Sequence, residues 1–371
     1  MLKVTDSIWN DGLRPFYLLG AIDGCLAMLA WTLSLSGHGA MSVSTHASGL
    51  IGGLLLAIVT GFLLTAVPNW TGRPLISPTG LRALTLLWLA GRATFWLAGL
   101  PVISLTIFPA VVAALIVHRF VVTASWRHWA IAIALITLSL AALLSHSGAF
   151  SDRSLHGWYL ALAAIAVLVT VIGGRIIPAF TNNAVPGADA RQLPWLDLGT
   201  VLATIIALAA WALGVRENLG SVLASVALGF QAIRFLLWRP WKTRAKLLLW
   251  ILPLSYLWLI VSLAMIALGL PSIPALHAMA AGAMGGMMLA VMTRSSKGHT
   301  GRALEADGWD GMIYGLVHLG AAFRVAAAFG FLLPDSLLLS GASWSAAFGL
   351  FAVRYWPVLT QPRLERGAQH S

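Results

Sequence analysis

The chain has 371 residues, of which 59% are hydrophobic and only 9% are charged, and its net charge is +11. Soluble domains have about 25% charged residues, so this chain has too few charges to cover a surface exposed to water. The composition also excludes a disordered chain, and the single cysteine excludes an intrachain disulfide framework. The sequence therefore predicts an all-α polytopic membrane protein.

Apolar segments long enough to be transmembrane helices follow one another along the chain, since about 20 residues cross the hydrocarbon core. We predict about twelve spans, at residues 16–35, 48–67, 81–99, 101–118, 129–145, 156–177, 195–214, 219–237, 247–268, 274–293, 311–333 and 338–359. The third and fourth spans are separated only by Leu100-Pro101.

The positive charge lies mainly in the short segments between these spans. With twelve spans, most of the 23 basic residues fall on the same side as the two termini. Arg153 and Arg216 fall on the opposite side, and Arg92, Arg324 and Arg354 lie within spans. The positive-inside rule then predicts cytoplasmic N- and C-termini. The charge is thus explained by topology, and we expect a lipid bilayer and no nucleic acid as partner.

Three histidines recur at corresponding places. His46, His156 and His277 each lie at the outer start of an even-numbered span, the second, sixth and tenth. The same spans lead into polar, glycine-bearing turns predicted at 68–74, 173–183 and 292–302. We interpret the chain as a single membrane domain, 1–371. It consists of three four-helix pseudo-repeats, at about 1–125, 126–246 and 247–371.

These histidines predict a shared site. Neutral imidazole is the commonest metal ligand and also an axial ligand of haem. Helical bundles commonly hold such cofactors between facing helices. The alternative is that each histidine sits at the membrane interface and bonds a loop carbonyl.

Two arginines lie deep within predicted spans, Arg92 in the third and Arg324 in the eleventh. A buried guanidinium needs an anionic partner or a set of carbonyls. The two propionates of a haem would serve both arginines. In the alternative arrangement, Asp23 pairs with Arg92, and Arg324 bonds backbone carbonyls.

The tenth span is rich in methionine. At 100° per residue His277, Met284 and Met288 share one helical stripe, and thioether with imidazole suits copper(I). Methionine also fills gaps between packed helices, so packing is the alternative. His318, in the eleventh span, is a ligand, a proton carrier or a polar contact between helices.

The sequence resembles the NnrS family of bacterial membrane proteins. The resemblance is carried by segments in the expected order along nearly the whole chain. They are Arg14-Pro15-Phe16, Gly61 to Pro74, Leu87 to Arg92, Gly173 to Asn183, and Gly285 to Arg302. Their combination is specific, whereas no single segment is.

The resemblance implies a twelve-helix protein of the bacterial inner membrane that contains haem, most simply of the b type, and copper. It also implies a role in the response to nitric oxide and nitrosative stress. Family members usually carry a His-Ala-His-Glu-like run at the start of the second span. In this chain that run is His46-Ala47-Ser48-Gly49, so the second histidine and the glutamate are replaced. His156 and His277 match further family histidines.

The plan is also similar to that of the catalytic subunit of haem–copper oxidases. That similarity implies His46 and His277 as axial haem ligands and His156 as a ligand to a second metal. The adjacent histidine pair that the oxidases have in the seventh span is missing from residues 195–214. Reduction of oxygen or nitric oxide at a binuclear centre is therefore not implied, and fold analogy is a weak basis for function.

Three functions follow from these observations. The first is a haem-binding protein that handles or senses nitric oxide, with redox or oxidoreductase activity left open. The second is a secondary transporter for a metal ion or small anion. The third is a carrier that passes copper or haem to another enzyme. The site residues for the first are His46, His277, Arg92 and Arg324 around a haem, and His46, His156, His277, Met284 and Met288 as metal ligands. The sequence leaves a homo-oligomer open.

Overall fold

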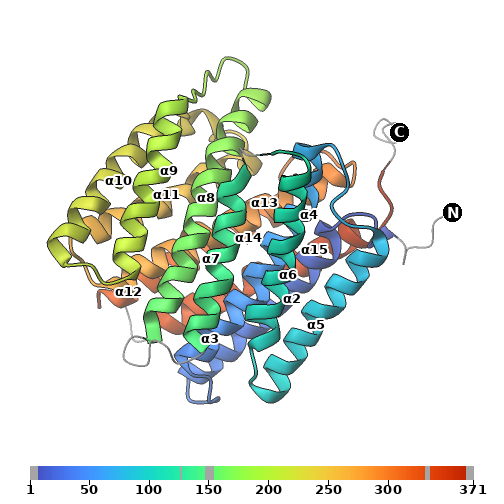
Figure 1. The fold of residues 1–371 in the computed structure, drawn as a ribbon, viewed down its shortest axis with the longest axis horizontal. Coiled ribbons are helices and arrows are strands. Elements are labelled where there is room, and N and C mark those ends of the chain that lie inside the picture. Colours follow the sequence, from blue (N-terminus) through green and yellow to red (C-terminus); the bar gives the residue numbers. More distant parts are fainter. Residues whose placement is uncertain (1–6, 126–127, 147–153, 331–334, 365–371) are drawn as a thin grey trace.

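The computed structural model describes residues 7–125, 128–146, 154–330 and 335–364. Over these residues every regular element is a helix and no strand occurs. Figure 1 shows long helices packed side by side in one bundle, in which α2 (Leu13–Leu35) packs along α15 (Ser336–Thr360). The structure confirms the all-α, polytopic fold class.

The remaining helices follow one another along the chain in three groups. The first third contains α3 (Val43–Gly49), η1 (Leu50–Leu55), α4 (Leu56–Thr71), α5 (Pro78–Ala98), η2 (Ile103–Ile107) and α6 (Phe108–Val122). The middle third contains α7 (Trp129–His146), α8 (Ser154–Ala184), α9 (Pro194–Ala212), α10 (Glu217–Leu237) and η5 (Pro240–Thr243). The last third contains α11 (Leu247–Ala267), α12 (Ser272–His277), η6 (Ala278–Met284), α13 (Gly285–His299), α14 (Gly308–Ala328) and α15.

A helix occupies each of the predicted ranges. Within the described residues, 10 helices are long and apolar enough to cross a membrane. The segments at α5, which carries Arg82 and Arg92, and at α7 are not among those 10. The number of spans and the threefold repeat therefore stay predictions.

Three of these membrane helices form the centre of the bundle. In the most apolar window of each helix, 72% of residues are buried in Val43–Thr71, 78% in Gly157–Ala184 and 67% in Ser272–His299. The other candidate spans have 28 to 61% of this window buried. The inner helices are thus the second, sixth and tenth, which begin near the three recurring histidines.

Two of the inner helices contain π-helical turns just after a histidine. Segment η1 begins four residues after His46, and η6 begins directly after His277. Such wide turns frequently mark functional sites in helices. They also change the side-chain register, so the α-helical projection that placed His277, Met284 and Met288 on one stripe does not hold across η6.

The helix ends follow ordinary capping chemistry. The Ser42 side chain accepts a hydrogen bond from the Thr45 amide at the start of α3. Asp307 and Asp310 form a reciprocal capping box at the start of α14. Gly72 ends α4 at φ +71°, a left-handed conformation that glycine adopts without steric cost. These caps satisfy backbone groups that would otherwise lack partners.

Two of the predicted turns are helical instead. The segment at 173–183 lies within α8, which continues to Ala184, and α13 continues through much of 292–302 to His299. The polar residues there are satisfied by tertiary contacts. For example, Asn182 exchanges two hydrogen bonds of 2.8 Å with the backbone of Ala190. Polar composition therefore did not end these helices, because neighbouring segments supply the partners.

Candidate functional site

His46 lies in the first turns of the second span. Its ring stacks on the Trp31 ring from α2, with centroids 4.5 Å apart and planes 23° apart. Its Nδ1 atom is buried and has no hydrogen-bond partner among the described residues. A buried ring nitrogen without a partner is costly in a protein interior, so this imidazole is a candidate to bind a ligand.

His277 ends α12 and is held by its own helix. Its Nδ1 lies 2.9 Å from the backbone carbonyl oxygen of Ile273. A carbonyl accepts from N–H, so this contact favours the neutral tautomer with the proton on Nδ1. The lone pair of Nε2 is then available, which is the arrangement found in metal-bound histidines.

Arg324 connects the two histidines electrostatically. It lies on α14, which packs against α12, and its charge interacts with both His46 and His277. His277 also interacts electrostatically with His46. Within the part of the chain that the structure describes, Arg324 makes no hydrogen bond or ion pair. Arg324 is therefore a cation without an anionic partner in this part of the chain, and its charge acts on histidines of the second and tenth helices.

Arg92 lies in a different environment. Its Nε donates to Asp23 Oδ1 over 2.9 Å, and both side chains are buried. Trp96 Nε1 donates to the same oxygen at 2.9 Å, and the Arg92 guanidinium lies 4.3 Å from the centroid of the Phe95 ring. This is the Asp23–Arg92 pair that the sequence left as an alternative. The terminal nitrogens of Arg92 remain without partners among the described residues.

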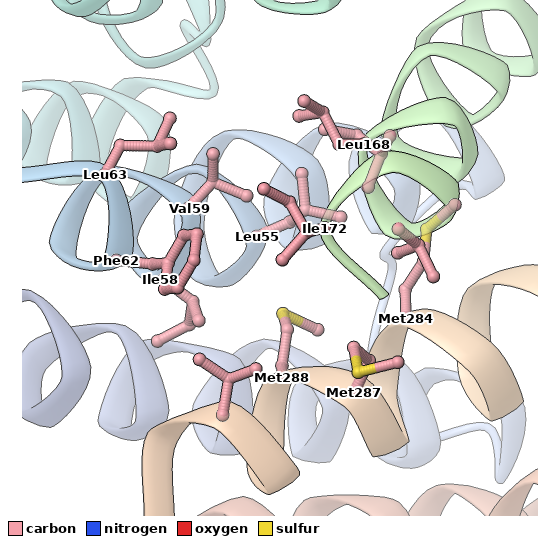
Figure 2. Close-up of a pocket in the computed structure, with 13 residues that line it drawn as sticks. Leu55, Ile58, Val59, Phe62, Leu63, Leu168, Ile172, Met284, Met287 and Met288 are labelled. Carbon is pink, nitrogen blue, oxygen red and sulfur yellow. The ribbon is translucent and has the colours of Figure 1, made fainter. Parts of the chain in front are cut away.

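The other predicted metal ligands are not part of this group as described. His156 belongs to α8, but its side chain lies outside the described residues. Met284 and Met288, with Met287, line a cavity between α4, α8 and α13 (Figure 2). In the described chain, no group of three His, Cys, Asp or Glu side chains is placed to hold a metal ion. Two imidazoles and a guanidinium fit a haem better than a metal ion bound by protein ligands alone.

His318 makes a polar contact between helices. Its Nδ1 accepts a hydrogen bond of 3.0 Å from Trp258 Nε1 on α11, while Nε2 is buried without a partner among the described residues. A Cβ added at Gly286 would lie 3.0 Å from the His318 ring. This glycine therefore allows α13 to approach the imidazole closely.

A buried polar network in the middle third was not recognised from the sequence. Arg234 lies inside α10 and not in a flanking loop, and its terminal nitrogen donates 2.5 Å to the Thr170 carbonyl. Tyr256 donates to Gln231 Oε1 at 2.5 Å, and Gln231 donates to Thr204 at 2.9 Å. The sequence pattern that could have predicted this network is the spacing of Gln231 and Arg234, because residues three apart lie on one face of a helix.

Charged groups at the ends of the helices are paired locally. Arg354 donates to Asp307 at 2.6 Å, and the Asp310 amide donates to Asp307 at 3.0 Å. Burial alone would raise the pKa of Asp307, but these hydrogen bonds and the charge of Arg354 hold it below its usual value. A similar balance lowers the pKa of Asp11, whose carboxylate contacts His299 and Thr65.

The fold and the site together define a polytopic, all-helical membrane protein with histidines at the start of its inner helices. The family model described as NnrS protein matches residues 7–363, nearly the whole chain. The chain therefore belongs to the NnrS family, as its sequence motifs predicted. A comparison with curated proteins found no match.

Proposed function

We propose that this NnrS-family membrane protein binds haem between His46 and His277 and handles or responds to nitric oxide. The observation that supports the proposal is the state of the two histidines, since His46 Nδ1 is buried without a partner in the described chain and His277 is held through Nδ1, while the charge of Arg324 acts on both. More than two hundred residues separate His46 from His277 in the sequence. A bound haem would supply an iron that binds nitric oxide and exchanges single electrons.

Each residue of this group has a separate task in the proposal. His277 offers Nε2 because its Nδ1 is held by Ile273. His46 offers a ring with no competing hydrogen bond among the described residues, and its position is fixed by the stack on Trp31. Arg324 offers its guanidinium for a propionate, a pairing that is strong and frequently bidentate.

In the proposal, the two deep arginines have different tasks. Arg92 already has a carboxylate partner in Asp23, so its main task in the proposal is to hold α5 against α2. Copper remains part of the proposal, with Met284, Met288 and His156 as its candidate ligands. The imidazoles of His46 and His277 alone would not complete a copper site of the usual kind, so copper needs these further ligands.

The test is a visible absorption spectrum of protein purified from haem-replete cells. Wild-type protein is expected to show a Soret band, and His46→Ala and His277→Ala are each expected to reduce it strongly. His38→Ala is the matched control, because His38 is an exposed histidine near the same end of the bundle. A folded, colourless wild-type protein, or equal bands in all three variants, would contradict the proposal.

Two further measurements separate the alternatives. Turnover of nitric oxide by pure protein supports an oxidoreductase, and its absence in a haem-loaded protein favours a carrier or sensor. Uptake of a metal ion or small anion into proteoliposomes supports a secondary transporter. Such uptake by a haem-free preparation would replace the haem proposal with that of a transporter.

A further inference from the structure

An apolar cavity lies between α4, α8 and α13, and it is open on one side, where lining residues such as Val59, Val169 and Met288 are half-buried. Figure 2 shows Met284, Met287 and Met288 facing Leu55, Val59 and Phe62 of the second span, with Leu168 and Ile172 of α8 beside them. The cavity has a volume of about 80 Å³. Its walls come from the three inner helices, which are the most buried of the bundle.

The chemistry of the walls excludes water as a stable occupant. Every lining residue is Leu, Ile, Val, Phe or Met, so no side chain offers a hydroxyl, amide or charge. A buried water needs two to four polar partners, and cavities lined only by apolar groups stay dry. A single water needs a cavity of roughly 10–15 Å³. The space is therefore ample for a small molecule but chemically unsuited to water.

The methionines favour a particular kind of guest. Thioether sulfur is soft and polarisable, so it gains dispersion contacts with any atom that fills the space. An engineered apolar cavity of about 150 Å³ in another protein binds xenon and benzene, and xenon is the smaller of the two. We propose that this cavity binds a small apolar gas molecule of the diatomic class, held by dispersion alone.

The position of the cavity relates gas binding to the candidate haem site. Leu55 lies nine residues after His46, and Met284 lies seven residues after His277. At 1.5 Å per residue, the cavity begins about 10–14 Å along the helices from the two histidines. A gas molecule dissolved in the bilayer would therefore be concentrated beside the candidate haem site. That link to nitric oxide rests on the proposed function, whereas the binding of gas does not.

The experiment uses xenon as the probe on the full-length protein in detergent or nanodiscs. Xenon-pressurised crystals or xenon NMR are expected to show one site among Val59, Val169 and Met288. Val59→Phe on α4 and Val169→Phe on α8 each fill the cavity from a different helix and are expected to abolish that site. Val353→Phe is the matched control, because Val353 is 75% exposed on α15, and it is expected to retain xenon.

The outcomes separate this inference from the haem proposal. Xenon needs no haem, so its absence from folded wild-type protein, or equal binding in Val59→Phe, overturns the cavity site alone. An acyl chain found in the cavity in place of xenon overturns it as well. If haem is present, the filled variants are expected to bind nitric oxide more slowly while keeping a wild-type Soret band. Unchanged association rates would remove the link between the cavity and the haem.

Discussion

The Nε atom of Arg92 lies 2.9 Å from Asp23 Oδ1, and both side chains are almost fully buried. This pair connects the first and third spans, and it packs against the backbone of Gly53 in the π-helical turn of the second. A charge pair in this position fixes three helices relative to one another. Arg324, the other deep arginine, has no such partner in the described chain, which leaves it available to an anionic group.

Breaking the Asp23–Arg92 pair is expected to destabilise the protein strongly. Asp23→Ala leaves a buried guanidinium without compensation, which typically costs about 3–5 kcal/mol. The double variant Asp23→Leu with Arg92→Met removes both charges and is expected to recover most of that loss. Thermal unfolding in detergent measures both. Asp189→Asn removes the charge from exposed pairs with Arg191 and Arg239 at a residue with φ +50°, a conformation that Asn tolerates, and it should leave the melting temperature almost unchanged. An equal loss in Asp23→Ala and Asp189→Asn would show that the buried pair has no special structural role.

Gly53 is expected to be intolerant of a side chain. A Cβ at this position would lie 2.9 Å from Arg92 Cζ and would overlap Asp23 Oδ2, so Gly53→Ala should cost about 1–3 kcal/mol, as overpacking usually does. The control is Gly229→Ala on α10, where no atom lies within 4 Å of the added Cβ. That change should be neutral or stabilising by up to about 1 kcal/mol. Equal changes in melting temperature in Gly53→Ala and Gly229→Ala would contradict the close approach of η1 to the ion pair.

The Asp307 carboxylate is expected to stabilise α14 as both a cap and an ion-pair partner. Asp307→Ala removes both and should cost about 1 kcal/mol. Asp307→Asn keeps a good cap acceptor and should cost less, because exposed ion pairs contribute little.

The pH dependence of this effect has a definite sign. The folded-state pKa of Asp307 lies below its usual value of 3.8, so its contribution is present above that value. The contribution is lost as the pH falls through the folded-state pKa. The difference in melting temperature between wild type and Asp307→Ala should therefore shrink below about pH 4. A constant difference down to about pH 2 would argue against the ionised pair.

If haem binds beside Arg324, this guanidinium should raise the reduction potential. Its positive charge favours the reduced iron, which carries one positive charge fewer than the oxidised form. Arg324→Gln is therefore expected to lower the midpoint potential measured by redox titration, and Arg324→Lys should restore much of it. Arg216→Gln, at the exposed start of α10, is the control. A potential that does not respond to Arg324→Gln would place the haem elsewhere.

The sequence by itself determined the class of protein and most of the helix positions. Long apolar segments with few charges have one stable form in lipid, because every backbone N–H and C=O must be bonded within the segment. The family also followed from the sequence, since its motifs recur in order along the chain and the family model covers residues 7–363. The deep arginines were visible as well, because a charge inside an apolar segment stands out by composition alone.

Only the tertiary structure decided which of these residues meet. It paired Asp23 with Arg92 and left Arg324 without a partner in the described chain, where its charge acts on His46 and His277, a choice that depends on the packing of helices far apart in sequence. It also placed π-helical turns beside two histidines and an apolar cavity between three inner helices. Sequence periodicity assumes a regular α-helix and does not say which helix packs against which. It therefore contains no information about a local π-helical turn or about the shape of the space between helices.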